Sequence, residues 1–226
     1  MRRLPLILLA LVLLLAYAPI TSAATIAPAQ AAETVRAELV RAQLALASDP
    51  ARAQRALDAA QSAYAGTLAG PFGSTLPAID ERARAGFAAA QSALETADAP
   101  AFAAARASTW AALLAGGYGM VEHALAANDA ASAQSWLPLR EFRHATRFSR
   151  PDSDATLAVA AAAAGTRPAA EALDAVRADL LDTYQARLTE AMHDLSTADA
   201  QGFATRRSEA AALADGYFAI LAPAYA

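Results

Sequence analysis

Alanine is the residue that most constrains the fold of this chain. The sequence has 226 residues and contains 70 alanines, whereas the β-branched residues Val, Ile and Thr are few. Alanine has the highest helix propensity and buries little apolar surface, while β-branched residues are the ones that favour strands. We therefore expect an all-α protein, built as a bundle of closely packed helical hairpins.

The first residues have the pattern of a secretory signal peptide. Arg2 and Arg3 precede an apolar run over residues 4–20, and small residues follow it. This order predicts cleavage after Ala23 or Ala24 and a mature chain that is periplasmic or otherwise extracytoplasmic. An uncleaved membrane anchor is the alternative, because the run is only slightly shorter than the ~20 residues of a spanning helix.

Charge and motif content exclude several functions. The chain has 18 basic and 22 acidic residues and a net charge of −4, so we expect no nucleic-acid partner. It has no cysteine, which rules out disulfides, thiolate chemistry and a cysteine-linked lipid anchor. Every basic residue is Arg, so no phosphate-binding loop with its Lys exists, and no Gly-x-Ser-x-Gly motif occurs. We expect no enzyme activity, and no membrane-spanning segment after the signal peptide.

Aspartates divide the mature chain into helices. Asp is a favoured helix N-cap, and Asp49 is followed by Pro50, which fits the first position of a helix. Residues 66–73 are rich in Gly and are predicted to be a loop. The glycines at 116, 117 and 119 predict a kink or a close helix crossing. The predicted caps are Asp49, Asp98, Asp129, Asp152 or Asp154, and Asp199.

The clearest helix is predicted from Pro168 to about Leu195. Its apolar residues recur every three or four positions, which places them on one continuous face. These residues are Leu173, Val176, Leu180, Tyr184, Leu188, Met192 and Leu195.

An internal repeat supports the hairpin architecture. Residues 94–99 (LETADA) resemble residues 195–200 (LSTADA), 101 positions later, and residues 114–118 (LAGGY) resemble residues 213–217 (LADGY). We interpret this as a duplication, with chance similarity between Ala-rich segments as the alternative. The predicted organisation is a signal peptide over 1–24 and one domain made of two helical halves, 25–135 and 136–226.

One pair of residues has the spacing of metal ligands. Glu190 and His193 lie three positions apart on the long predicted helix, which places both side chains on the same face. Di-iron helical bundles use two such Glu-x-x-His pairs and a Glu from each of two further helices. Glu190 and His193 are therefore candidate metal ligands, and a surface contact between the two side chains is the alternative.

An arginine-rich segment is the second candidate site. On a helix, its four arginines would form one cationic stripe that binds an anion or an acidic partner through planar guanidinium groups. The alternative is an internal ion-pair network with nearby acids. The arginines are Arg140, Arg143, Arg147 and Arg150, and the acids are Glu141, Asp152, Asp154, Asp179 and Asp182.

Five segments of the chain resemble a known protein family. They are residues 136–143 (WLPLREFR), 146–151 (TRFSRP), 154–157 (DATL), 176–188 (VRADLLDTYQARL) and 216–225 (GYFAILAPAY). These segments resemble the extracytoplasmic N-terminal region of bacterial iron permeases of the oxidase-linked, high-affinity type. The resemblance covers most of the mature chain and is densest from Trp136 onward.

The resemblance implies an accessory domain of an iron-uptake system, with a membrane-embedded iron permease as partner and iron as the metal it would bind. Permeases of this type carry Arg-Glu-x-x-Glu motifs on spanning helices, but here His144 stands where the second Glu would be. No iron ligand of the permease core is therefore transferred to this chain. The alternative function is a structural helical-repeat module that binds another protein and no metal.

Overall fold

The computed structural model describes residues 26–142 and 154–225, and this part of the chain confirms the all-α prediction. It contains nine α-helices, one short 3₁₀ helix and no strand. The elements are α2 (Pro28–Ala45), α3 (Pro50–Thr67), α4 (Ala69–Thr75), α5 (Pro77–Glu95), α6 (Ala99–Ala126), α7 (Ala130–Trp136), α8 (Ala155–Ala163), α9 (Ala169–Ala200), α10 (Ala204–Leu221) and η1 (Ala222–Ala224).

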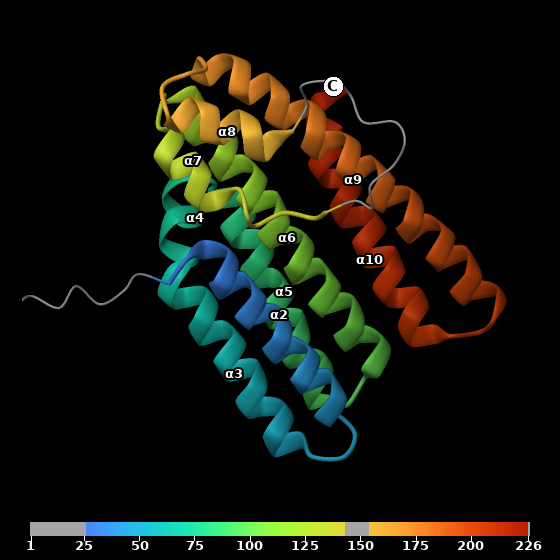
Figure 1. The fold of residues 1–226 in the computed structure, drawn as a ribbon. Helices are drawn as coiled ribbons and strands as arrows, with labels where there is room; N and C mark the ends of the chain where they lie inside the picture. The colour runs from blue at the N-terminus through green and yellow to red at the C-terminus, as the bar shows by residue number, and fades with distance from the viewer. Residues whose placement is uncertain (1–25, 143–153, 226) are drawn as a thin grey trace, which may run out of the picture.

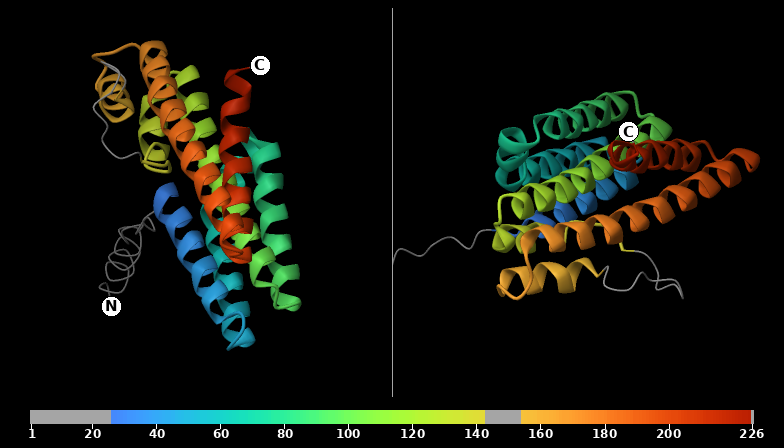
Figure 2. Two further views of the ribbon diagram at one scale, coloured as in Figure 1. Left: turned by 90° about the vertical axis from the view of Figure 1, so that its right-hand side faces the viewer. Right: turned by 90° about the horizontal axis from the view of Figure 1, so that it is seen from above.

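Three long hairpins form the bundle, and the central helix is α6. The hairpins are α2–α3, α5–α6 and α9–α10, and they lie side by side with the short helices α4, α7 and α8 at one end (Figure 1). Helix α6 contacts α2, α5, α9 and α10, so both predicted halves of the chain share one hydrophobic core. The two further views show that α10 lies between α9 and the α5–α6 pair (Figure 2).

Helix α4 corrects the prediction of a loop over residues 66–73. The backbone continues from α3 into α4 because Phe72 is completely buried in the core and anchors this segment. Its ring lies 5.6 Å from that of Trp136, measured between centroids. A Cβ atom on Gly116 would lie 2.1 Å from the Phe72 ring, so only glycine lets the ring approach α6 here. In place of the predicted kink or close helix crossing, the structure shows that Gly116 admits the Phe72 side chain against α6.

Aspartate caps begin four of the helices as predicted. The side chains of Asp49, Asp98, Asp129 and Asp154 each accept a hydrogen bond from a backbone N–H in the first turn of α3, α6, α7 and α8. These bonds satisfy N–H groups that have no partner within the helix.

The cap predicted at Asp199 is wrong, because Asp199 lies inside α9 and α10 starts after Phe203. Gly202 has a φ of +72°, a conformation that glycine adopts without steric cost, and the turn forms there. In the α5–α6 hairpin the positive φ is at Ala97, which the sequence repeat pairs with Ala198. The two turns therefore differ in position along the repeat, and the duplication stays a prediction.

The apolar face of α9 is only partly covered. Val176, Leu180 and Tyr184 are buried, whereas Met192 is 54% exposed. The second half of α9 packs on α10 and extends away from the rest of the bundle (Figure 1). The sequence period therefore identified the inward face of α9 but not the point at which the other helices stop covering it.

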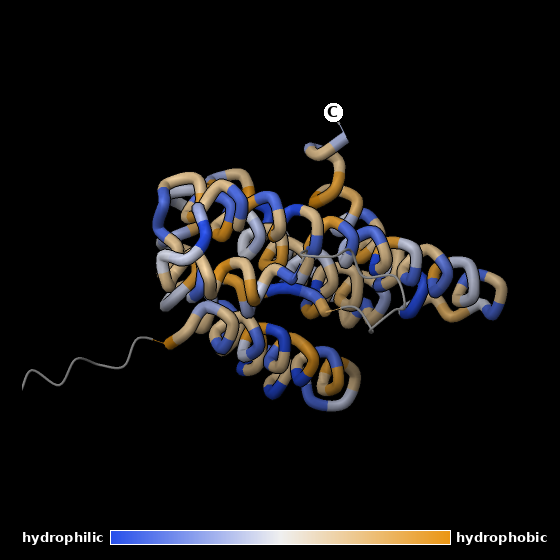
Figure 3. Tube along the Cα trace, turned by 45° about the horizontal axis from the view of Figure 1, so that its top comes forward, coloured by the Kyte–Doolittle hydropathy of each residue, from blue (hydrophilic) through white to orange (hydrophobic). Residues whose placement is uncertain are grey.

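Hydrophilic residues are distributed along the long helices (Figure 3). Within residues 26–142 and 154–225, no helix is long and apolar enough to cross a membrane.

Candidate functional site

The carboxylate of Glu141 joins three helices. Its Oε1 accepts hydrogen bonds from Trp110 Nε1 on α6 at 3.0 Å and from the Tyr217 hydroxyl on α10 at 3.1 Å. Its Oε2 lies 3.7 Å from Nε of Arg187 on α9, and the Glu141 side chain is only 18% exposed. We call Glu141, Trp110, Tyr217 and Arg187 the Glu141 cluster. Because water is largely excluded, these charge-assisted contacts are stronger than equivalent contacts at the surface.

The segment after α7 brings Glu141 into this position. A Cβ atom on Gly117 would lie 2.3 Å from the carbonyl oxygen of Leu139, so glycine at 117 lets this segment lie directly against α6. Nη2 of Arg187 donates a hydrogen bond to the carbonyl of Phe142, and Nη1 bonds Glu190 at 2.6 Å. Arg187 therefore fixes the backbone beside Glu141 and pairs with its carboxylate as well.

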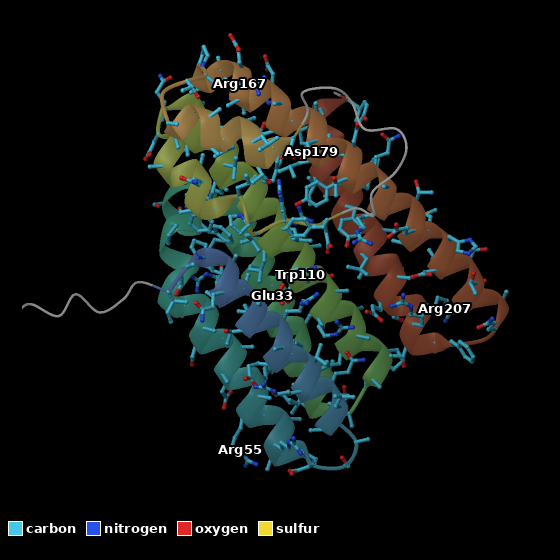
Figure 4. The ribbon with its side chains drawn as sticks, in the orientation of Figure 1. Glu33, Arg55, Trp110, Arg167, Asp179 and Arg207 are labelled. Carbon is cyan, nitrogen blue, oxygen red and sulfur yellow. The ribbon has the colours of Figure 1, made fainter. Side chains whose placement is uncertain are left out.

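Arg140 points to the neighbouring helices α8 and α9. Its Nη2 donates a hydrogen bond to Thr156 Oγ1 at 2.7 Å, and its Nη1 lies 4.0 Å from Asp179 Oδ2. The same oxygen of Asp179 accepts a bond from the backbone N–H of Ala155, at the start of α8. Asp179 is labelled in Figure 4. The Arg140 side chain that approaches it is only 11% exposed. Burial lowers the pKa of the Arg140 guanidinium.

The environment of Arg140 favours a structural ion pair. Its Nε and Nη1 atoms are shielded from solvent and have no hydrogen-bond partner among the residues that the structure describes. An anion from solution would have to displace neighbouring groups to reach them. Residues 139–142 are not helical, so the expected helical stripe does not include Arg140. Arg143, Arg147 and Arg150 lie outside the described residues, and anion binding by the segment stays a prediction.

Buried tyrosines extend the Glu141 cluster. Tyr184 is completely buried, and its ring centroid lies 6.4 Å from that of Tyr118 and 6.1 Å from that of Tyr217. Burial raises the pKa of Tyr184 and of Tyr217 well above the ordinary value, and the charge of Glu141 raises both further. Asp182, a predicted site residue, lies half-buried on α9, three positions after Asp179.

The structure places Glu190 and His193 on the exposed outer half of α9. The Glu190 carboxylate is 53% exposed and pairs with Arg187. The described parts of the chain contain no group of three or more His, Asp or Glu side chains arranged to hold a metal ion. Metal binding by Glu190 and His193 therefore stays a prediction, and iron would have to compete with Arg187 for the carboxylate.

A groove of about 630 Å³ lies where α10 ends, and we call it the terminal groove. Most of its lining is apolar. On one side, Glu122 Oε1 accepts hydrogen bonds from Arg177 Nε at 2.7 Å and from the Tyr118 hydroxyl at 3.1 Å. This groove could not be predicted from the sequence, because its walls come from four separate segments. They are Leu76 and Ile79; Ala115, Tyr118, Gly119 and Glu122; Arg177 and Leu181; and Ala219, Ile220, Pro223 and Ala224.

Comparison with known proteins identifies the family. Residues 24–226 match the family described as the iron permease FTR1 N-terminal domain. The chain belongs to this family. The resemblance found in the sequence is thereby confirmed over the whole helical bundle, and the chain is a component of an iron-uptake system. No curated protein and no solved structure gave a significant match.

Proposed function

We propose that this FTR1 N-terminal domain works outside the cytoplasm as an accessory domain that contacts a membrane-embedded iron permease. The observation that carries the proposal is the family match, which spans every described helix and starts at Ala24, where the mature chain is predicted to begin. The signal-peptide pattern of residues 1–24 supports the extracytoplasmic location.

The geometry of Glu141 supports a contact role over an ion-conducting one. Arg140 and Glu141 begin the only stretch that resembles the Arg-Glu-x-x-Glu motif of the permeases. The Glu141 carboxylate is occupied by Trp110, Tyr217 and Arg187, so it holds three helices together. In this domain, the Arg-Glu dipeptide has a structural role.

Iron binding at Glu190 and His193 is the second proposed role. Both residues are accessible to solvent and three positions apart on α9, so they can approach one ion from the same side. A helical-repeat module that binds a protein and no metal is the alternative, and a titration separates the two.

Isothermal titration of the purified mature chain with Fe²⁺ under anaerobic conditions, and with Fe³⁺ citrate, tests metal binding. If the pair binds iron, a double variant Glu190→Ala/His193→Ala should bind more than tenfold more weakly than the wild-type chain. Glu171→Ala is the matched control, because Glu171 is also an exposed acid on α9 that pairs with an arginine. Wild-type protein that binds neither ion would end the metal hypothesis and leave the contact role.

Co-purification tests the contact role. Affinity-tagged mature chain, isolated from mildly solubilised membranes of the source cells grown without iron, should carry the iron permease with it, identified by mass spectrometry. Recovery of the chain free of any iron permease would contradict the proposed function.

A further inference from the structure

The terminal groove has the size and chemistry of a binding site for an apolar helix. Its volume of about 630 Å³ is within the usual range for ligand clefts, and its floor consists of aliphatic side chains such as Leu76, Ile79 and Ile220. The charges at its side compensate each other, because Glu122 is bonded to Arg177. A groove of this kind accepts the apolar face of a helix in preference to a charged ligand.

Two exposed aromatic residues are sequence neighbours of residues that line the groove. Phe218 is 60% exposed and Tyr225 is 73% exposed, and each is adjacent in sequence to a residue that lines the groove, Ala219 and Ala224. Aromatic residues are enriched in protein interfaces and at the boundary between membrane and water. The end of α10 thus combines an apolar groove with two exposed rings.

The position of η1, the last helical turn, indicates which helix binds in the terminal groove. Pro223 and Ala224, in this last helical turn, form one wall of the groove. In a family defined as the N-terminal domain of an iron permease, the permease part follows this position. When both parts are on one chain, the permease part therefore follows on the side of the domain where the groove lies. Such a tether raises the effective concentration of the helix to the millimolar range.

We propose that the terminal groove holds an apolar helix from the start of the membrane-embedded permease. This assignment rests on the function proposed above and names the surface through which the contact is made. The same groove takes the same helix from a separate permease chain when the two parts are not covalently joined.

Photocrosslinking in the source cells tests the assignment. The full chain carries p-benzoyl-phenylalanine in place of Ala219, which lies in the groove, or in place of Leu44, which is 79% exposed on α2. Irradiation should join the Ala219 position to a peptide from the first helix of the iron permease, and the Leu44 position should not form this adduct.

Two variants provide an independent measurement. Ala219→Trp fills the groove, and Ala224→Asp places a charge at its exposed mouth. Each should reduce co-purification of the permease more than tenfold, with helicity unchanged by circular dichroism, whereas Leu44→Trp should leave it at the wild-type level.

The outcomes separate the groove from the proposed function. In one outcome, the chain still co-purifies with the permease while the crosslinker forms adducts only to a second copy of this chain or to lipid, or forms none. That result would refute the assignment of the permease helix to the groove and preserve the contact role. The assignment would also be refuted if both groove variants co-purify with the permease as well as the wild-type chain does. If the wild-type chain does not co-purify with an iron permease, the proposed function itself fails.

Discussion

Removing the carboxylate of Glu141 should destabilise the whole bundle. In Glu141→Ala, the indole N–H of Trp110 and the hydroxyl of Tyr217 lose their acceptor, and Arg187 loses one of its two carboxylate neighbours. Because these groups come from α6, α9 and α10, the loss affects three long helices of the bundle at once. We therefore expect the free energy of unfolding of the whole bundle to fall, and not only a local change at the surface.

The structure sets the size of the effect. Each hydrogen bond to a charged acceptor contributes about 1.5–3 kcal/mol, and removal of one partner from a buried ion pair costs about 3–5 kcal/mol. The Glu141 side chain is 18% exposed, so little of this is lost to screening. We expect a loss of about 3–5 kcal/mol, which lowers the melting temperature by roughly 6–20 °C for a chain of this size.

Urea denaturation followed by circular dichroism measures the change. Glu141→Gln keeps an oxygen acceptor without the charge and should lose about 1–2 kcal/mol. Glu190→Ala is the matched control, since it removes a carboxylate that pairs with the same Arg187 but is 53% exposed, and it should lose about 0–1 kcal/mol. The Glu141 cluster does not hold the helices together if Glu141→Ala loses less than about 1 kcal/mol of unfolding free energy, or loses less than the control Glu190→Ala.

Three further outcomes follow from burial, backbone geometry and pKa. In a urea titration, Leu180→Ala should lose about 2–5 kcal/mol of unfolding free energy, whereas Met192→Ala, exposed on the same face of α9, should lose under about 1 kcal/mol. Equal losses would contradict the burial assigned to the two residues. Gly202→Ala, at φ +72°, should lose about 1–2 kcal/mol of unfolding free energy, whereas Gly70→Ala, inside α4 with open space around it, should gain about 0.5–1 kcal/mol. An unchanged stability of Gly202→Ala would mean that the turn lies elsewhere. Tyrosines such as Tyr184 have a raised pKa in the folded protein, so their contribution to stability is complete below about pH 10 and is lost as pH rises above it. Tyrosinate absorbance that appears before the helical circular-dichroism signal falls would show that these tyrosines are not buried.

Most of the fold could be predicted because its determinants are local in sequence. Asp49, Asp98 and Asp129 lie next to the helices that they cap, and the apolar period along α9 depends on neighbours three or four positions away. Helix α4 could not be predicted in this way. It depends on the burial of Phe72 against Gly116, a contact between residues far apart in the chain.

The same distinction applies to the turn before α10. The repeat suggested a cap at Asp199, but Gly202 offers a conformation that costs less, and α9 continues to Ala200. Sequence similarity between two hairpins therefore does not fix where each one turns. Gly202 has the positive φ in the α9–α10 turn, whereas Ala97 has it in the α5–α6 turn.

The candidate site was only partly visible in the sequence. Arg140 and Asp179 were singled out for their charge, and the structure brings them within 4.0 Å of each other. The partners of Glu141 were missed, because Trp110 and Tyr217 lie 31 and 76 positions away from it. Their own surroundings in the sequence are ordinary helix. Only the packing of α6, α9 and α10 around the segment after α7 reveals the cluster.

Uptake of radioactive iron by cells tests whether the protein acts in iron uptake outside the cytoplasm. Cells that lack this gene, grown under iron limitation, are supplied with the full chain or with a form without residues 2–24, which is expected to stay in the cytoplasm. Permease levels are checked by immunoblot in each strain. Uptake should fall in the deletion strain and recover only with the exported form. Uptake that is unaffected by the deletion, or restored equally by the form without its signal, would contradict an extracytoplasmic role in iron uptake.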